Sequence, residues 1–203
     1  MEERNETKKE EETKRKKILS IAGELMLYAM IIVSCTFLIP NYVIAKTVVS
    51  GESMENTLKD KDVLLVEKLS YRLEEPERFD VIVFYHFWDM NNPDKKDKDA
   101  YEFYVKRVIG LPGETVQIKE DGTIYINGEL LEEDFGKDVI EDAGRVLEPI
   151  TLGDDEYFVL GDNREVSIDS RSDEVGNVKK DWILGQVCVR VYPFDKIGIV
   201  SGK

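Results

Sequence analysis

The stretch that organises the chain is Val48-Val49-Ser50-Gly51-Glu52-Ser53-Met54-Glu55-Asn56-Thr57-Leu58. Two β-branched residues end an extended run, and Gly51 then opens a turn. Ser53 follows on a backbone that can present its hydroxyl, with the apolar Met54 next to it. A serine in a turn is usually no more than a turn residue. Motifs elsewhere in the chain therefore decide whether Ser53 is a nucleophile.

The composition excludes several classes of protein. The chain has 203 residues and a net charge of −14, so it has no basic field to collect the phosphates of a nucleic acid. Its two cysteines, Cys35 and Cys188, are too far apart for a metal-binding motif, and the apolar surroundings of Cys35 disfavour a disulfide framework. The only histidine is His86, so a histidine-based zinc site lacks ligands. We expect no metal, no organic cofactor and no nucleic-acid partner.

The N-terminal part predicts a membrane anchor. Residues 1–17 carry seven Lys or Arg and six Glu, which predicts a solvated cytoplasmic tail. Residues 18–39 are mostly apolar and would span about 33 Å as a helix, against a hydrocarbon core of about 30 Å. The basic residues before this run predict a cytoplasmic N-terminus. We expect a single-pass protein of the cell membrane, with a transmembrane anchor over 18–40 and an extracytoplasmic domain over 41–203.

Two other interpretations of the apolar run stay open. A cleaved signal peptide is one, since Val43-Ile44-Ala45 offers a small-x-small site, although signal peptides have apolar regions of only about 7–15 residues. A helix buried in a protein core is the other, although the length and the basic flank of this run are typical of a membrane span.

Beyond residue 45 the pattern is that of short β-strands. Seven runs rich in β-branched and aromatic residues are separated by polar turns, and no long amphipathic helix follows. The runs are 63–66, 81–85, 101–109, 115–118, 123–126, 157–160 and 186–192. Asp121-Gly122 and Asn127-Gly128 are turn signals, and the first predicts a hairpin. We therefore expect a mainly β fold, in which a transmembrane helix precedes an antiparallel β-sheet domain.

Two segments are predicted to leave that sheet. Asp89 to Asp99 is polar, which predicts a mobile loop. Residues 115–155 are acidic and rich in turns, and we expect them to form a small inserted β-lobe. Phe84, Phe87 and Trp88 come just before the loop. They pack in the core in one interpretation and rest on the membrane surface in the other.

Lys106 lies in the run Tyr104-Val105-Lys106-Arg107-Val108-Ile109-Gly110-Leu111-Pro112-Gly113-Glu114. In a strand, Tyr104, Lys106 and Val108 share one face, whereas Arg107 lies on the other. If the face of Lys106 is buried, desolvation lowers the pKa of its amine from about 10.4 toward about 7–8, where the amine can act as a base. On an exposed face Lys106 would be an ordinary surface lysine.

A third informative stretch is Val159-Leu160-Gly161-Asp162-Asn163-Arg164-Glu165-Val166-Ser167-Ile168-Asp169-Ser170-Arg171. A strand ends in a Gly-Asp-Asn turn, and small polar residues then alternate with apolar ones. Ser167, Asp169 and Arg171 would share a face if this segment is extended. Such a segment can hold a neutral lysine by hydrogen bonds and form a buried Asp–Arg pair, or it can be an ordinary polar loop.

Together these stretches resemble the bacterial type I signal peptidases, in the branch with one N-terminal membrane span. The resemblance covers the anchor and essentially the whole of the domain that follows. It rests on four motifs in this order: Gly51-x-Ser53-Met54-x-x-Thr57-Leu58, Arg78 to Phe84, Tyr104 to Glu114, and Gly161 to Arg171. The resemblance implies a serine endopeptidase with a Ser/Lys dyad on a β-sheet fold. It would cut signal peptides from exported preproteins at the outer face of the membrane.

Carried over by position, the resemblance assigns a role to the candidate catalytic residues. Ser53 is the nucleophile, whose backbone N–H should donate to the oxyanion, and Lys106 is the general base. Ser167 orients the lysine amine. Asp169 and Arg171 form a supporting pair.

The resemblance also implies how the substrate is selected. Asp162 begins the motif that shapes the site. The apolar pocket lining would consist of Val49, Met54, Leu58, Tyr104 and Val105. Such pockets admit small side chains at the first and third positions before the cut and exclude bulky ones. The implied partners are signal peptides of exported preproteins and membrane lipid.

Two positions depart from the family pattern. Asn56 stands where the family often has proline, which puts the rigidity of this turn in question. Gly51 stands where some members have a Ser or Thr that helps to bind the oxyanion. We expect the backbone to contribute more to oxyanion binding here, as in other one-span members.

Three other hypotheses about the function compete with this one. A sortase-like transpeptidase would use Cys188 with His86 and Arg190, although Cys188 lies in an alternating run typical of a half-buried strand. A tethered acidic β-module could bind an exported partner without catalysis. A self-cleaving regulator of related fold is disfavoured because the chain has an anchor and no DNA-binding region.

Overall fold

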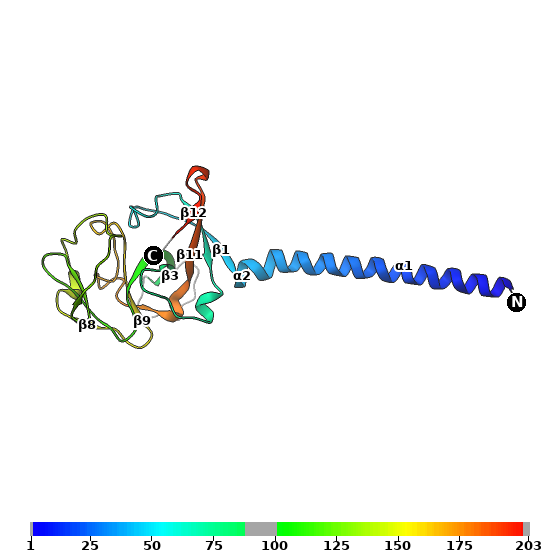
Figure 1. Cartoon of the computed structure of the whole chain (residues 1–203), viewed down its shortest axis with the longest axis horizontal. Helices are drawn as coiled ribbons and strands as arrows, with labels where there is room; N and C mark the ends of the chain where they lie inside the picture. The colour runs from blue at the N-terminus through cyan, green and yellow to red at the C-terminus, as the bar shows by residue number, and fades with distance from the viewer. Residues whose placement is uncertain (1, 88–100, 201–203) are drawn as a thin grey trace. The chain divides into compact units, whose positions relative to one another are not determined.

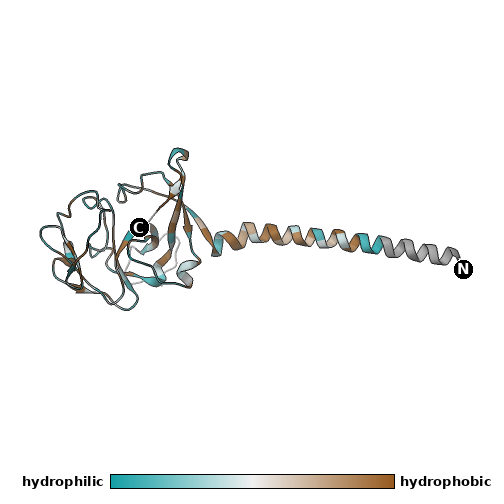
Figure 2. Cartoon of the chain, in the orientation of Figure 1, coloured by the Kyte–Doolittle hydropathy of each residue, from teal (hydrophilic) through white to brown (hydrophobic). Residues whose placement is uncertain are grey.

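The computed structural model describes residues 2–87 and 101–200, and the chain divides into two compact units, Met1–Val43 and Ile44–Lys203. The first unit is helical and comprises α1 (Glu2–Val33), a π-helical turn η1 (Ser34–Leu38) and α2 (Ile39–Tyr42) (Figure 1). Lys14–Tyr42 is long and apolar enough to cross a membrane. Figure 2 shows apolar residues along much of this segment.

The helix begins earlier than the sequence pattern indicates. A solvated tail was expected up to residue 17, but α1 starts at Glu2. Glu, Lys and Arg have high helix propensity, and opposite charges four residues apart stabilise a helix. The charged segment can therefore continue the helix of the apolar run.

The second unit is built on an eight-stranded sheet with strand order β1-β2-β11-β3-β4-β9-β10, and β12 pairs with β11. The strands are β1 (Ile44–Val48), β2 (Val63–Glu67), β3 (Val81–Phe87), β4 (Tyr101–Gly110), β9 (Glu156–Leu160), β10 (Val178–Lys179), β11 (Ile183–Tyr192) and β12 (Gly198–Ile199). All of these pairs are antiparallel. The predicted fold class, mainly antiparallel β after an N-terminal apolar helix, is confirmed.

A second sheet lies within residues 115–151. Its order is β7-β6-β5-β8, formed by β5 (Thr115–Ile118), β6 (Ile124–Ile126), β7 (Glu129–Leu130) and β8 (Ile150–Thr151). The hairpin predicted at Asp121-Gly122 joins β5 to β6. Between β6 and β7, Asn127 and Gly128 both have positive φ, as a tight two-residue hairpin turn requires.

The two sheets share one apolar core. Ile109 and Phe158 of the main sheet are buried in the same cluster as Val116 and Ile126 of the second sheet. Gly110 lies between them, and a Cβ at this position would approach Val116 Cγ2 to 2.7 Å. The second sheet is therefore packed onto β4 and β9 by close contact, and its loops have fixed positions relative to the main sheet.

The remaining elements are short and irregular. Four 3₁₀ turns occur in the described part of the chain: η2 (Ser70–Arg72), η3 (Gly144–Val146), η4 (Lys180–Trp182) and η5 (Phe194–Lys196). Phe84 is buried, as its core interpretation predicts. Trp88 and the loop expected from Asp89 to Asp99 lie outside the described residues.

We expect Gly185→Ala to lower the free energy of unfolding by about 1–3 kcal/mol, the usual cost of overpacking. Gly185 lies at an irregularity in the pairing of β11 with β3, and a Cβ there would collide with the carbonyl oxygen of Glu67. The measurement is thermal unfolding of the full chain in detergent micelles. Gly198→Ala is the matched control, because a Cβ at Gly198 meets nothing within 4 Å. Equal effects of the two changes would contradict the packing argument.

Candidate active site

Ser53 lies in the loop that connects β1 to β2. Backbone hydrogen bonds close its turn, from Glu55 N to Glu52 O (3.0 Å) and from Leu58 N to Met54 O (2.8 Å). Met54 and Leu58 are buried in the core cluster beneath the loop, together with residues of β2, β3 and β11. The apolar side chains anchor the turn, and Ser53 is presented on its outer side.

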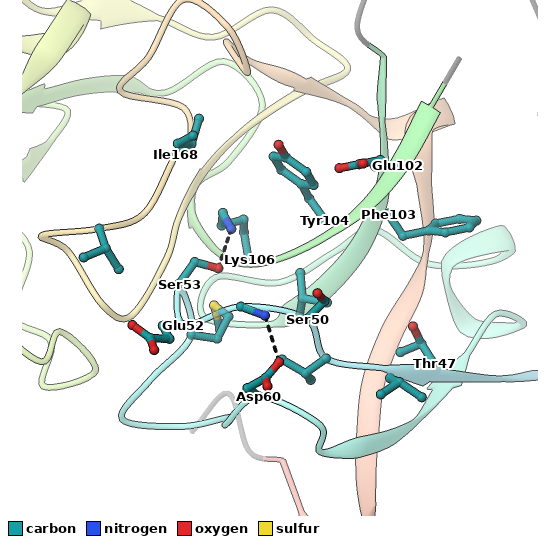
Figure 3. A pocket seen from close by; sticks show the side chains of 16 residues that line it. Thr47, Ser50, Glu52, Ser53, Asp60, Glu102, Phe103, Tyr104, Lys106 and Ile168 are labelled. Carbon is teal, nitrogen blue, oxygen red and sulfur yellow. Dashed lines mark hydrogen bonds between the residues drawn. The ribbon is translucent and has the colours of Figure 1, made fainter. Parts of the chain in front are cut away.

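Lys106 comes from the centre of β4, where it is paired with Ile82 of β3. Its side chain is almost completely buried, and its Nζ lies 5.1 Å from the centre of the Tyr104 ring on the same strand face. Lys106 Nζ lies 2.8 Å from Ser53 Oγ, which is hydrogen-bonding distance (Figure 3). The fold thus brings together two residues that are 53 positions apart in the sequence.

Burial lowers the pKa of Lys106 from 10.5 to about 8. Desolvation is the largest cause, because a buried ammonium loses its hydration. The carboxylates of Asp169 and Asp162 act in the opposite direction, and the guanidinium of Arg171 lowers the pKa further. A large share of the amines is neutral near pH 8, so Lys106 can accept a proton from the adjacent hydroxyl.

Arg107 points to the opposite face of β4, where it forms an ion pair that the sequence did not reveal. Its Nε and Nη2 donate to the carboxylate of Asp162 at 2.9 and 2.7 Å, and both side chains are completely buried. Thr57 Oγ1 donates to the same carboxylate at 2.5 Å. Asp162 therefore links β4 to the loop of Ser53. In the sequence, the only signal for this ion pair was that a charged residue, Arg107, follows Lys106 in an otherwise apolar strand.

The segment 161–171 forms turns and is not extended, so the condition under which Ser167, Asp169 and Arg171 would share one face is not met. Backbone bonds such as Ser167 N to Asn163 O (3.1 Å) fold the segment back on itself. Asp169 and Arg171 nevertheless form a pair, with Nε donating to Oδ1 at 2.8 Å. The Oγ of Ser167 is buried without a hydrogen-bond partner in the part of the chain that the structure describes.

Gly161 and Asn163 fix the backbone of Ser53. Asn163 N donates to Ser53 O at 3.0 Å. A Cβ at Gly161 would collide with that carbonyl oxygen and with Ser167 Oγ. Only glycine therefore allows the 161–171 segment to approach Ser53 this closely.

A groove of about 980 Å³ runs past Ser53 and Lys106. Four of the five predicted pocket residues line it: Val49, Met54, Tyr104 and Val105. Leu58 does not, because its side chain is completely buried in the core beneath the turn. Val48, Val166 and Ile168 also line the groove, and Figure 3 shows Ile168 on the loop across from Lys106. Sequence analysis missed these three because their exposure depends on the turns of two separate loops.

Cys188 and His86, which the sortase-like hypothesis requires as partners, do not lie close together. Gln186 of β11 lies opposite Ile82 of β3, and the two strands are antiparallel. Cys188 therefore lies near the level of residue 80, whereas His86 lies toward the other end of β3. A separation of about six strand residues corresponds to roughly 20 Å. Burial also raises the pKa of the Cys188 thiol, which makes it less reactive. His86 instead stacks on the ring of Tyr104, with 4.4 Å between ring centres.

Within residues 2–87 and 101–200, no three His, Cys, Asp or Glu side chains are grouped so that they could hold a metal ion. Two of the carboxylates near Ser53 and Lys106 are instead held by arginines, Asp162 by Arg107 and Asp169 by Arg171. The arrangement can perform base-assisted attack by a hydroxyl.

Comparison with known proteins identifies the family of this chain. Residues 22–192 match the family described as signal peptidase, peptidase S26. This chain belongs to the signal peptidase family.

Two curated relatives that this chain matches over most of their length are both named as signal peptidase I enzymes. The chain is 34% identical over 198 residues to a probable signal peptidase I-2 of Synechocystis, covering 97% of this chain and 84% of the relative. It is 34% identical to a signal peptidase I of Bacillus amyloliquefaciens, covering 94% and 97%. A crystal structure of a signal peptidase I from Enterococcus faecalis V583 is 34% identical and covers 56% of this chain and 97% of that chain, with a TM-score of 0.41. The enzyme class predicted from the motifs, a signal peptidase I, is confirmed.

We expect Lys106→Met to stabilise this signal peptidase at pH 7, by up to about 3 kcal/mol. The pKa of Lys106 is lower in the folded than in the unfolded chain, so below about pH 8 both states are protonated and the folded state bears the full cost of a buried charge. Between about pH 8 and 10.5 the unfolded state binds more protons, so the wild type gains stability as the pH rises. The advantage of the variant should disappear by about pH 10.5.

The measurement is denaturant unfolding of the full chain in detergent at several pH values. Lys119→Met is the control, because Lys119 is exposed in the turn between β5 and β6 and its removal relieves no burial. A stability difference for Lys106→Met that is constant from pH 7 to 10.5 would contradict the buried-amine argument.

Proposed function

We propose that this signal peptidase removes N-terminal signal peptides from exported preproteins, with Ser53 as nucleophile and Lys106 as general base. The observation that carries the proposal is the 2.8 Å separation of Ser53 Oγ from Lys106 Nζ, in a position where the amine is almost completely buried. A buried amine with a pKa near 8 can be neutral without any neighbouring imidazole. The pair therefore meets both requirements for activating a hydroxyl, contact and a matched pKa.

The reaction follows from the roles of the two groups. Neutral Lys106 accepts the hydroxyl proton as Ser53 Oγ attacks the scissile carbonyl carbon. The tetrahedral intermediate collapses, and the lysine ammonium returns the proton to the departing amine of the mature protein. The signal peptide stays bound to Ser53 as an ester. Lys106 then deprotonates a water molecule, which hydrolyses the ester and regenerates both residues.

The backbone of Ser53 is suited to stabilise the oxyanion. Its N–H donates to no other group in the described part of the chain, so it is available to the developing charge. Gly51 brings no side-chain hydroxyl. Its own N–H is held by Asp60 Oδ1 at 3.1 Å (Figure 3). The oxyanion would thus be bound mainly by backbone on this side of the site.

The polar residues behind the dyad support it. Asp162 is held by Arg107 and Thr57, and Asp169 is held by Arg171. We assign Ser167 the role of orienting the Lys106 amine. Its buried hydroxyl has no hydrogen-bond partner among the described residues and is therefore available for this role.

The groove accounts for the substrate preference that we propose. Val49, Met54, Tyr104 and Val105 form apolar walls close to Ser53, and such walls accept small side chains and exclude bulky ones. An extended peptide in this groove would place small residues at the first and third positions before the cut. The proposed substrates are therefore signal peptides with this pattern.

We also propose that residues 18–40 anchor the enzyme in the membrane, with residues 1–17 in the cytoplasm and the catalytic domain, residues 41–203, outside. The side chains of Lys14–Tyr42 are exposed and not buried in a core, which favours contact with lipid. Basic residues precede the span, which favours a cytoplasmic N-terminus. Membrane lipid is then a partner, and the net charge of −14 disfavours nucleic acid.

We expect Ser53→Ala, Lys106→Met and Lys106→Arg each to lower kcat/KM for preprotein cleavage by about 10³-fold or more. The arginine variant keeps the positive charge but cannot give up its proton, so it tests the base function directly. The assay uses the full chain in detergent and a purified preprotein, with mass spectrometry to locate the cut.

Lys119→Met serves as the control and should keep wild-type activity. In the wild type, kcat/KM should rise about tenfold for each pH unit below about 8 and level off above it, because only the neutral amine is active. Appreciable cleavage by the Ser53→Ala or Lys106→Arg variant would remove the dyad from the mechanism.

The membrane topology makes a separate prediction. Protease added to intact spheroplasts should digest the domain after residue 40 and leave an N-terminal epitope tag protected until the membrane is disrupted. The protein should also stay in the membrane pellet at alkaline pH. Release from the pellet, or loss of the tag in intact cells, would contradict the proposed anchor or its orientation.

A further inference from the structure

A short segment from the second-sheet region reaches back to the nucleophile loop. It comprises Glu133, Asp134, Phe135, Gly136 and Lys137, between β7 and η3, and we call it the strap. The Phe135 ring covers the buried guanidinium of Arg107 at 3.8 Å and packs beside Phe79. The strap thus closes the rear of the Arg107–Asp162 pair.

The strap is held in a defined shape by its own carboxylate. Glu133 Oε2 accepts hydrogen bonds from the backbone N–H of Phe135 (2.9 Å) and Gly136 (3.3 Å). The other carboxylate oxygen, Oε1, forms an ion pair with Arg164 Nη2 at 2.9 Å, and both side chains are nearly buried. Gly136 lies against the Arg164 guanidinium, where a Cβ would come within 3.2 Å of Cζ.

One peptide group links the strap to the nucleophile. This is the peptide unit between Asp162 and Asn163. Its carbonyl oxygen, Asp162 O, accepts from Lys137 N at 2.7 Å, and its N–H, on Asn163, donates to Ser53 O at 3.0 Å. A peptide group is planar and rigid, so a displacement of the strap is passed directly to the backbone of Ser53.

A second link reaches the outer side of the Ser53 turn. Asn56 Nδ2 donates to Phe135 O at 3.0 Å. Lys137 Nζ lies 3.2 Å from Glu55 Oε2, but this pair is solvent-exposed and contributes little. The Asn56 bond is also exposed, but of the two contacts only it ends on the backbone of the strap, at Phe135 O, so it restrains the path of the chain there.

Asn56 also has an unusual backbone conformation, with φ of 107°. Side chains other than glycine rarely adopt this region, and the cost is offset only where surrounding contacts hold the residue in place. The bond to Phe135 O is such a contact. It fixes the centre of the turn that carries Ser53 three residues earlier.

We propose that the strap is a positioning element for the nucleophile, and that Asn56 is the residue through which it acts on the Ser53 turn. This inference rests on the proposed function of Ser53 and Lys106. Asn56 is not part of the groove lining and does not touch the dyad. It holds the turn so that the hydroxyl stays within reach of the amine, which matters because small displacements of reacting groups cost large factors in rate.

Two substitutions at Asn56 separate this role from relief of backbone strain. Asn56→Gly allows the positive φ but removes the amide donor, and Asn56→Asp keeps the shape but places an oxygen against Phe135 O. We expect kcat to fall about 5- to 20-fold for Asn56→Gly and further for Asn56→Asp, while KM changes less than about twofold. If Asn56 only had to tolerate its φ, Asn56→Gly would keep full kcat.

Asn127→Gly is the matched control. Asn127 is also exposed, also has positive φ, and also makes a side-chain hydrogen bond, accepting from Thr115 N at 2.9 Å, but it lies in the second sheet away from the strap. This variant should keep wild-type kcat and KM.

A double substitution tests whether Asn56 acts through the strap. Glu133→Gln weakens the ion pair that shapes the strap, so the loss of kcat caused by Asn56→Gly should shrink to less than about threefold in that background. Circular dichroism and thermal unfolding of each variant in detergent distinguish a positional effect from unfolding, since a folded variant with lowered kcat is the expected result.

The outcomes separate this inference from the proposed function. Wild-type kcat in Asn56→Gly, or losses in Asn56→Gly and Glu133→Gln that simply multiply, would overturn the role of the strap and leave the dyad intact. Failure of the wild type to cleave preproteins, or activity without Ser53 or Lys106, would overturn the proposed function itself.

Discussion

The structure depends on one contact, the amine of Lys106 held without water against the hydroxyl of Ser53. A lysine in water is protonated at neutral pH and cannot remove a proton from an alcohol. Removal of its hydration disfavours the charged form, and in the proposed mechanism the neutral amine then acts as the base. The cost of that burial falls on the stability of the fold, as is common where a site needs an unfavourable group in a fixed place.

The surrounding charges are arranged so that this desolvation is not cancelled. Asp162 and Asp169 are near enough to stabilise a lysine ammonium, and each raises the pKa of Lys106. Each carboxylate is, however, held by its own arginine, Arg107 or Arg171. The two ion pairs present little net charge to the amine. They satisfy buried polar groups of the loops without making Lys106 a permanent cation.

The second sheet contributes more than an appended surface. Its core is continuous with that of β4 and β9, so it is rigidly joined to the strand that carries Lys106. Through the strap it also contacts the loops that hold Ser53. Residues of the dyad are thus supported from two independent directions, one within the main sheet and one from the inserted segment. The hydrogen bond from Asn56 Nδ2 to Phe135 O is the tertiary contact that holds the outer side of the Ser53 turn.

The β class and the apolar helix could be predicted from the residues alone, because both follow from local periodicity. Ser53 and Lys106 became a candidate pair only through the order of four motifs that resembles the signal peptidases, since each residue taken alone is more typical of an ordinary turn serine or surface lysine. The alternation of side chains along a strand placed Lys106 on one face with Tyr104 and Val108, but it did not decide whether that face is buried, which depends on the neighbouring strands and loops. Three features could be seen only in the folded chain: the pairing of Asp162 with Arg107, the burial of Leu58 in the core outside the groove lining, and the contact of Phe135 with the Ser53 turn through Asn56. Those contacts join segments about 50 to 80 residues apart, and their geometry is set by sheet order and by turns with few residues of regular structure, which local pattern does not encode.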